Sequence, residues 1–165
     1  FHSDAGKIAA AIEAGISLHG DIGAKQLVQT LLKCQTPQDF LSGKFGADKF
    51  LAARKKMERE TEKALKTAKI EESERLMLVT FSSKYKIKSE IVQKMKMDSP
   101  GKFVFVFQRD GAAWRFSARG PGGLPEMITP FGGGHPRAAG GVVPAGKIGK
   151  FLEKIKAESA KYDGS

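Results

Sequence analysis

The residues of this sequence best suited to chemistry lie at positions 131–141, FGGGHPRAAGG, where five glycines surround one His and one Arg. Glycine amides have no Cβ beside them, so several N–H groups can point at one anion. His135 and Arg137 add side-chain donors, and Arg can hold a phosphate with two parallel hydrogen bonds. We predict a loop with exposed backbone, because glycine weakens helix and strand interiors. The pattern favours a phosphate or nucleotide site over the alternative, a tight connection with packed glycines.

The net charge of +10 is concentrated on residues 44–150, whereas residues 1–43 carry a small negative charge. An excess of Lys and Arg attracts polyanions, because neutralising phosphates releases counterions. The sequence therefore favours single-stranded nucleic acid, a short oligonucleotide or a nucleotide phosphate as the partner. The alternative is a basic surface that only keeps the protein in solution.

Composition places the chain among globular proteins, with 165 residues of which 41% are hydrophobic and 28% charged. No apolar run reaches the roughly 18 residues that span a bilayer, and the N-terminus lacks the pattern of a signal peptide. The single Cys34, expected to be buried on a helix, rules out an internal disulfide and fits a reducing compartment. We therefore expect a cytoplasmic protein without a membrane partner.

Residues 1–72 are predicted to form a helical arm. A first helix is expected over 5–15, capped by Asp4. A second helix, over 22–34, is expected to bury one apolar face, made of Ala24, Leu27, Val28, Leu31 and Leu32. Thr36-Pro37-Gln38-Asp39 has the composition of a helix start, and one long linker helix is expected over 47–72.

From residue 73 onward the pattern alternates between strands and helices. Strands are predicted over 76–81, 102–108, 113–118 and 141–143, and helices over 87–97, 125–129 and 147–161. The order βαββαβα predicts an α/β domain with a mixed sheet over residues 73–165.

The strand predicted at 113–118 separates apolar from basic side chains. Two sets alternate along it: Trp114, Phe116 and Ala118 on one face, and Arg115, Ser117 and Arg119 on the other. The aromatic residues of this strand and the preceding one suit a base-stacking platform. Core packing is favoured instead, because the sheet needs a buried face.

A strand, a helix, a hairpin ending in Ser117-Ala118-Arg119 and then GGGHPRAAGG together resemble the DHH-associated domain (first type). This is the C-terminal substrate-binding domain of DHH phosphoesterases, which include RecJ-type exonucleases, nanoRNases that also act on pAp, and cyclic-dinucleotide phosphodiesterases. The resemblance covers residues 76–158. It implies a domain that closes over a nucleotide and holds its phosphates.

The resemblance also implies a set of substrate-binding residues, namely Ser117, Arg119, Gly132, Gly133, Gly134, His135 and Arg137. Within this set, Arg119 would pair with a phosphate, and the glycines and His135 would contact the substrate. In the family, paired manganese ions or magnesium in a separate DHH domain carry out hydrolysis.

The metal-binding part of the family pattern is missing from this chain. It has no Asp-His-His triplet, and His2 with Asp4 forms only a fragment of a His-x-Asp-x-Asp motif. We therefore expect neither a metal site nor a cofactor here, and no hydrolysis by this chain alone. An N-terminal DHH domain is the expected partner, with residues 1–72 as the end of that domain and its linker.

Two other functions remain open. The C-terminal domain of alanyl-tRNA synthetase, which binds tRNA and forms dimers, is similar, although His135 and the Pro-Arg after it favour the phosphoesterase. A structural fragment that forms a homodimer is the third interpretation. The sequence does not choose among RNA, DNA, a dinucleotide and pAp.

Overall fold

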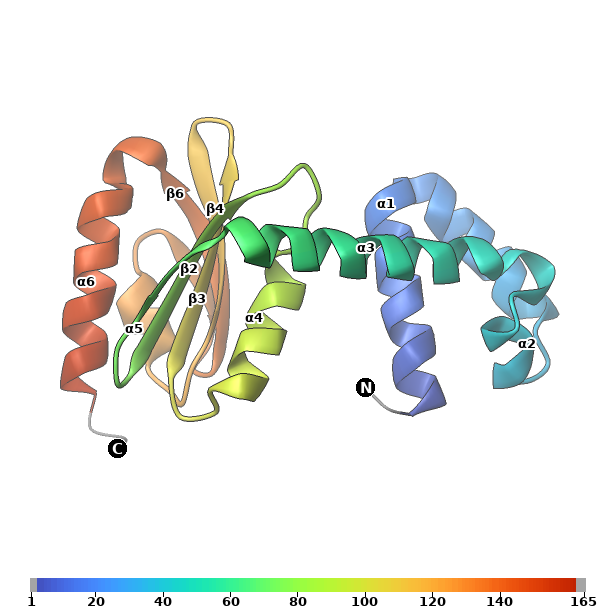
Figure 1. Cartoon of the computed structure of the whole chain (residues 1–165), viewed down its shortest axis with the longest axis horizontal. Helices are drawn as coiled ribbons and strands as arrows, with labels where there is room; N and C mark the ends of the chain where they lie inside the picture. Colours follow the sequence, from blue (N-terminus) through green and yellow to red (C-terminus); the bar gives the residue numbers. More distant parts are fainter. Residues whose placement is uncertain (1–2, 163–165) are drawn as a thin grey trace. The chain divides into compact units, whose positions relative to one another are not determined.

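The computed structural model describes residues 3–162 (Figure 1), which form two compact units that meet in the sequence between residues 62 and 63. The first unit is helical, and the second contains a six-stranded sheet with helices packed against it. No helix within residues 3–162 is long and apolar enough to cross a membrane. The predicted fold class, a mixed α/β sheet domain preceded by a helical arm, is confirmed.

Helix α1 (Asp4–Lys33) accounts for half of the helical unit and bends at Gly20, whose φ of 57° and ψ of −140° are not helical. The sequence predicts two separate helices here, the first ending at Gly15. Instead the helix continues through Gly15. A Cβ at this position would lie 2.2 Å from the Phe50 ring. Glycine is kept there for close packing and not for a turn.

The first turn of α1 is capped by Ser3, whose Oγ accepts a hydrogen bond from the Gly6 amide at 3.2 Å. The predicted cap, Asp4, is instead the first helical residue. Its carboxylate accepts hydrogen bonds from Lys7 at 3.1 Å and from the Gln38 amide at 3.0 Å.

Helix α2 (Pro37–Leu41) begins where the sequence predicts, with a complete capping box. The Asp39 amide donates to Thr36 Oγ1 at 3.3 Å, and the Thr36 amide donates to the Asp39 carboxylate at 3.1 Å. The short 3₁₀ turn η1 (Lys44–Gly46) and helix α3 (Asp48–Thr67) follow. Lys44 Nζ lies 2.8 Å from the Asp39 carboxylate and ties the turn to the cap.

The helical unit contains a small core cluster, Ala11, Leu27, Phe40, Ala47 and Phe50, with the half-buried Cys34 packed against it. The predicted apolar face of residues 22–34 is only partly buried. Leu27 enters the core, but Val28 and Leu32 are 57% and 82% exposed. The unit therefore presents large apolar side chains outward.

The six strands of the second unit are arranged in the order β1-β2-β3-β4-β6-β5. Their bounds are β1 Lys69–Glu72, β2 Leu76–Ser82, β3 Phe103–Asp110, β4 Ala113–Arg119, β5 Gly132–His135 and β6 Ala138–Pro144. Only β2 and β3 are parallel, and helix α4 (Lys88–Asp98) connects them. Helix α5 (Leu124–Ile128) precedes β5, and the turn η2 (Ala145–Lys147) and helix α6 (Ile148–Lys161) follow β6.

The two edge strands were not expected from the sequence. Residues 69–72 were predicted as the end of a helix, but α3 stops at Thr67 and these residues pair with Met77–Thr80 of β2. Residues 132–135 were predicted as a loop, but they pair with residues 138–141 of β6. In both cases hydrogen bonding to a strand that is already in the sheet outweighs local propensity.

Helices cover the two faces of the sheet unequally (Figure 1). On one face α5 and α6 bury Phe105, Phe107 and Phe116, and the last two pack against Phe151 of α6. These rings are fully buried, so they are core residues and not a base-stacking platform. On the other face α4 packs mainly against β3 and β4. We call this second side the α4 face.

Candidate phosphate-binding site

Arg119 and His135 lie in the same transverse row of the sheet, although they are far apart in the sequence. Arg119 of β4 is opposite Ala138 of β6, and Ala138 is in turn opposite His135 of β5. Directly opposed residues point to the same side of a sheet. The side chains of Arg119 and His135 therefore share one face, with only the small Ala138 between them.

The neighbouring row adds Ser117, Gly140 and Gly133, which oppose one another in the same way. Ser117 Oγ lies 3.4 Å from Ser89 Oγ in the first turn of α4, which identifies the shared side as the α4 face. Four of the predicted residues are thus on one surface: Ser117, Arg119, Gly133 and His135.

The glycine run has two structural roles that alternate along β5. Gly132 and Gly134 face the core side, where a Cβ would lie 2.4 Å from the carbonyl oxygens of Gly140 and Ala138 respectively. Gly133 faces the α4 side, and a Cβ there would meet nothing within 4 Å. Gly132 and Gly134 are therefore needed for packing, and only Gly133 leaves open surface beside Arg119 and His135.

Arg119 and His135 are available to a ligand. Nη1 of the half-buried Arg119 donates to the carbonyl of its neighbour Ala118 at 2.9 Å, and His135 is exposed. Within residues 3–162 neither side chain forms an ion pair. An anion placed between them would thus have two donors that no carboxylate competes for.

Arg137 does not belong to this row. It lies in the tight turn between β5 and β6, and its Nε donates to the carbonyl oxygen of Pro121 at 3.1 Å. Its backbone carbonyl also accepts from the Gly120 amide at 3.2 Å. In this structure Arg137 fastens the β5–β6 turn to the loop that follows β4.

The α4 face carries further cations that the sequence analysis did not assign to the site. Burial lowers the pKa of Lys88, at the start of α4, and the nearby charges of Arg115, Lys86 and Arg119 lower it further. The alternation of Lys84, Lys86 and Lys88 is a visible signal in the sequence. It was missed because nothing local shows that these lysines lie next to β4.

No cluster of three or more His, Cys, Asp and Glu side chains that could hold a metal ion exists within residues 3–162. Asp4, which the sequence places in a fragment of a metal motif, is bonded to Lys7 and Gln38. His2 lies outside the described residues. The described residues thus offer donors for an anion and no built site for a cation.

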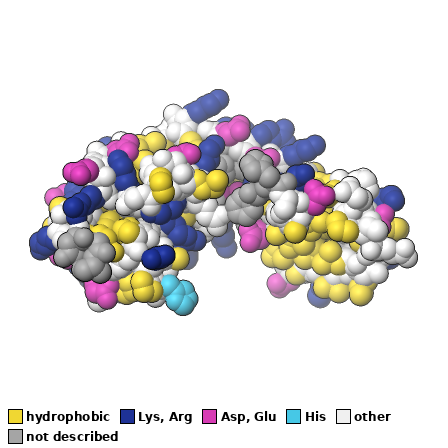
Figure 2. Space-filling model, turned by 90° about the horizontal axis from the view of Figure 1, so that it is seen from below, with side chains coloured by type: hydrophobic (Ala, Val, Ile, Leu, Met, Phe, Trp, Pro, Cys, Tyr) yellow, Lys and Arg dark blue, Asp and Glu magenta, His cyan; other side chains and the backbone are white. Residues whose placement is uncertain are grey.

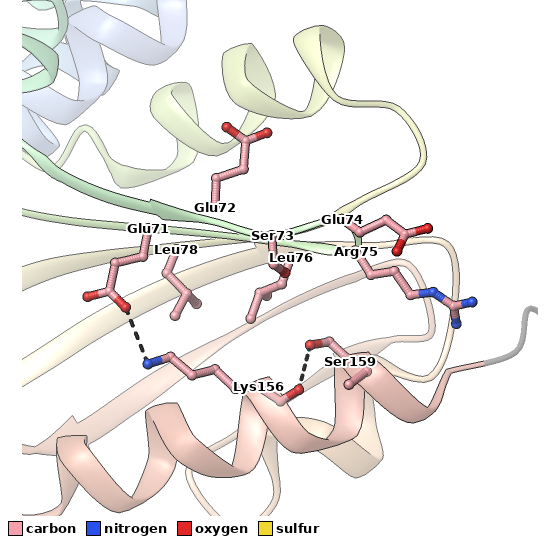
Figure 3. A pocket seen from close by; sticks show the side chains of 10 residues that line it. Glu71, Glu72, Ser73, Glu74, Arg75, Leu76, Leu78, Lys156 and Ser159 are labelled. Carbon is pink, nitrogen blue, oxygen red and sulfur yellow. Dashed lines mark hydrogen bonds and ion pairs between the residues drawn. The ribbon is translucent and has the colours of Figure 1, made fainter.

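A cavity of about 590 Å³ in the sheet unit lies elsewhere (Figure 3). It lies between α6 and the β1–β2 hairpin, with Leu76 and Leu78 as its apolar wall. Its lining includes Glu71, Glu74, Arg75 and Lys156, and Glu71 is 3.3 Å from Lys156, whereas the Glu72 side chain points away from the cavity. None of the predicted phosphate-binding residues lines this cavity, so it is not the predicted site.

Comparisons with known proteins agree with the fold. No protein-family model and no curated protein sequence matches the chain. Among solved structures, RecJ from Thermus thermophilus in complex with Mg²⁺ is 15% identical with a TM-score of 0.71 and matches 95% of this chain. Exonuclease RecJ bound to manganese, also 15% identical, gives 0.68 over 95%. A DHH-domain member of the s1p family of ribosomal proteins, at 15% identity, gives 0.67 over 94%.

The likeness extends over nearly the whole of this chain but over only part of each neighbour. The chain spans 25% of the Thermus RecJ, 40% of the manganese-bound RecJ and 42% of the DHH-domain protein. Both units are included, because 94–95% of the chain is matched. The chain thus has a fold found within RecJ and a DHH-domain protein, which confirms, at the level of the fold, the resemblance to DHH phosphoesterases predicted from the sequence.

Proposed function

We propose that this chain is the phosphate-binding part of a DHH-type phosphoesterase that acts on nucleic acid or nucleotides. The observation that carries the proposal is the shared row of Arg119 and His135, with the open backbone of Gly133 beside it. Two kinds of donor, a guanidinium and an imidazole, lie on one face without a competing carboxylate, beside a backbone position that carries no side chain. Donors of these two kinds bind phosphate groups.

The geometry suits one phosphate group held between two strands. Arg119 and His135 are separated by two strand spacings, roughly 10 Å between backbones. Long side chains that lean toward each other across Ala138 can close such a distance on a group the size of a phosphate. A hydrogen bond to a charged group contributes about 1.5–3 kcal/mol, so the two donors together supply useful affinity.

Hydrolysis is assigned to a separate DHH domain that is not among the described residues. Metal-assisted phosphodiester cleavage needs several carboxylate and imidazole ligands, which residues 3–162 do not bring together. Manganese or magnesium in that domain would supply the activated water. The names of two similar structures record Mg²⁺ and manganese, which supports this division of labour.

The helical unit has a surface that fits such a partner domain. Its exposed large apolar side chains are Ile16, Ile22, Val28, Leu31, Leu32 and Phe45. Figure 2 shows hydrophobic side chains gathered over one face of this unit, at the right of the view. Apolar patches of this kind mark protein contact surfaces. The chain spans only 25–42% of the similar structures, so in those proteins additional chain exists that can provide the cover.

The proposal is tested by binding of labelled single-stranded oligonucleotides to point variants. We expect Arg119→Ala and His135→Ala each to weaken binding by roughly tenfold or more, because each removes a charged hydrogen bond. The double variant should lose less than the sum of the two single losses, since both residues hold the same phosphate. Thermal unfolding should change little, because neither side chain is in the core.

The matched control is Lys150→Ala. Lys150 is exposed and lies on α6, the helix that packs against the opposite face of the sheet. Lys154 on the same helix is unsuitable, because its Nζ donates to the carbonyls of Glu126 and Thr129 at 2.9 and 2.8 Å. Equal losses in Lys150→Ala and Arg119→Ala would show non-specific charge attraction and refute the site.

A further inference from the structure

A basic groove of about 510 Å³ lies on the α4 face, next to the row of Arg119 and His135. We define it by the β2–α4 loop (residues 83–88), the end of β3, the middle of β4 and residues 140–142 of β6. The backbone of Gly140 and Gly141 lines it without side chains, and Ser117 belongs both to the groove and to the neighbouring row. The groove and the candidate phosphate site are therefore adjacent parts of one surface.

The groove contains four cations that face it and one carboxylate. The loop contributes Lys84 and Lys86, the start of α4 contributes Lys88, and β4 contributes Arg115. Asp110 is the carboxylate, and it is bonded to Arg115 Nε. Within residues 3–162 the three lysines form no ion pair, so their charges are unneutralised.

Arg109 also lines the groove, but its guanidinium is engaged elsewhere. It lies over the ring of Trp114, 5.4 Å from the centroid, and its Nε donates to the Gly111 carbonyl at 2.8 Å. Register places Arg109 opposite Trp114, whose side chain packs against the core on the other face. Arg109 is therefore not counted among the groove cations.

The lysines are presented on a fixed loop. The side chain of Gln108, buried at the end of β3, donates from Nε2 to the carbonyls of Ser83 and Tyr85 at 2.8 and 2.6 Å. The Tyr85 amide in turn donates to Ser83 Oγ at 3.0 Å. A loop held in this way places its cations before a ligand arrives, which lowers the entropy cost of binding.

The cations continue from the groove to the phosphate site without interruption. Arg115, Ser117 and Arg119 are alternate residues of β4, so Arg115 and Arg119 are roughly 13 Å apart along the strand. Lys88 lines the groove together with Arg115 and Ser117, and the Oγ of the next residue, Ser89, lies 3.4 Å from Ser117 Oγ. His135 extends the track across β6 by roughly another 10 Å.

We propose that this track binds successive phosphates of a single-stranded oligonucleotide, so that the ligand of the site is a polynucleotide strand and not a nucleoside bisphosphate or a dinucleotide. The inference rests on the proposed function, because Arg119 and His135 form one end of the track. A small nucleotide carries its phosphates on one or two riboses and reaches only that end. An acidic protein is disfavoured, because the centres of protein interfaces are poor in lysine.

The test compares two ligands, an oligothymidylate of about 12 nucleotides and a nucleoside 3′,5′-bisphosphate. The variant is Lys84→Ala/Lys86→Ala, in which both residues are exposed and their loss leaves the core intact. Its charge-matched control is Lys94→Ala/Lys150→Ala, which also removes two exposed lysines, from the outer side of α4 and from α6. Fluorescence anisotropy over a range of salt concentrations gives both the affinity and its salt dependence.

We expect Lys84→Ala/Lys86→Ala to weaken oligothymidylate binding by roughly tenfold at low salt and to lower the salt slope by about 1.4, which is two single-strand phosphate contacts. Bisphosphate binding should stay unchanged. The inference is overturned if the control variant loses as much affinity, if bisphosphate binding falls equally, or if a polyglutamate peptide of equal charge binds as tightly. Arg119→Ala distinguishes failure of this inference from failure of the proposed function. If this variant binds both ligands as tightly as the wild type, the proposed function fails as well.

Discussion

The helical unit and the sheet unit differ in what they leave exposed. The helical unit buries Leu27 and Phe40 but turns Val28 and Leu32 outward. The sheet unit has an aromatic core on one side, and on the other side it leaves a cationic groove beside the residues that α4 covers. An apolar surface suits a protein partner, whereas an unpaired cationic surface suits a polyanion. In the proposed function the two units would contribute through different chemistry, the helical unit by contact with a second domain and the sheet unit by contact with phosphate.

The same contrast exists within the glycine run. Gly132 and Gly134 belong to the packed side of β5, and Gly133 belongs to the open side. One run of identical residues thus contains two packed positions and one open position, and the proposed function assigns binding to the open one. Variants of neighbouring glycines separate these two uses.

The largest effect on stability is expected at Gly132. Gly132→Ala brings a Cβ to 2.4 Å from the Gly140 carbonyl oxygen and 2.9 Å from the Phe116 ring. We expect a loss of about 1–3 kcal/mol in the free energy of unfolding, as for other overpacked sites. Urea unfolding of the two proteins measures it.

Gly133→Ala is the matched control for that variant. Its Cβ meets nothing within 4 Å, so the free energy of unfolding should stay within about 0.5 kcal/mol of the wild type. Oligonucleotide affinity should nevertheless fall, because the methyl group stands where the backbone approaches phosphate. Equal destabilisation by both substitutions would mean that the two sides of β5 are not different.

A smaller effect is expected at the start of α2 in the helical unit. Thr36→Ala removes the hydroxyl that accepts the Asp39 amide, and N-cap losses of this kind cost about 1 kcal/mol. Helix content measured by circular dichroism during urea unfolding reports on this unit. Gln35→Ala is the neighbouring control, because the structure gives its side chain no capping role. An equal loss in the control would contradict the prediction.

The capping box also makes this unit sensitive to acid. The ion pair with Lys44, together with the Thr36 and Gln35 amides, lowers the pKa of Asp39 to about 2. A folded pKa below the unfolded value gives stabilisation that is present above about pH 4 and is lost as the pH falls toward 2. Asp39→Asn should remove this dependence, and an unchanged pH profile in that variant would exclude Asp39 as its source.

The smallest effect on stability is expected on the exposed apolar surface of the helical unit. A change there should instead alter the self-association of the chain. Leu32→Ser changes a side chain that is 82% exposed, so the free energy of unfolding should move by less than about 0.5 kcal/mol. Self-association of the isolated chain, measured by sedimentation, should decrease because the apolar patch is interrupted. Gln29→Ser on the same helix is the control, and equal behaviour of the two variants would remove the case for a docking surface.

Much of the sheet unit could be predicted from local patterns. The alternation along β4 separated Phe116 from Ser117 and Arg119, and the structure has them on opposite faces. The Asp110-Gly111 turn joins β3 and β4 as expected. These features depend on side-chain period and turn geometry, which involve only near neighbours.

The errors occurred where distant segments decide the structure. Residues 132–135 have the composition of a loop, yet β6 supplies a hydrogen-bonding edge, and the ring of Phe116 leaves room only for glycine at position 132. The helix predicted through residue 72 ends at Thr67 because β2 offers a pairing partner to residues 69–72. Val28 and Leu32 have the spacing of a buried face, but only Leu27 finds a core to enter.

By itself, the sequence determined the alternating faces of the strands, the capping box of α2, the basic character of the second unit and the resemblance carried by Ser117-Ala118-Arg119 and the glycine run. These properties follow from residue type and short-range spacing. The tertiary structure was needed to show that Arg119 and His135 flank Ala138, that Lys88 and Arg115 line one groove, and that Gly133 alone of its run is open. The reason is that strand order and register join segments far apart in the chain, and no local pattern specifies them.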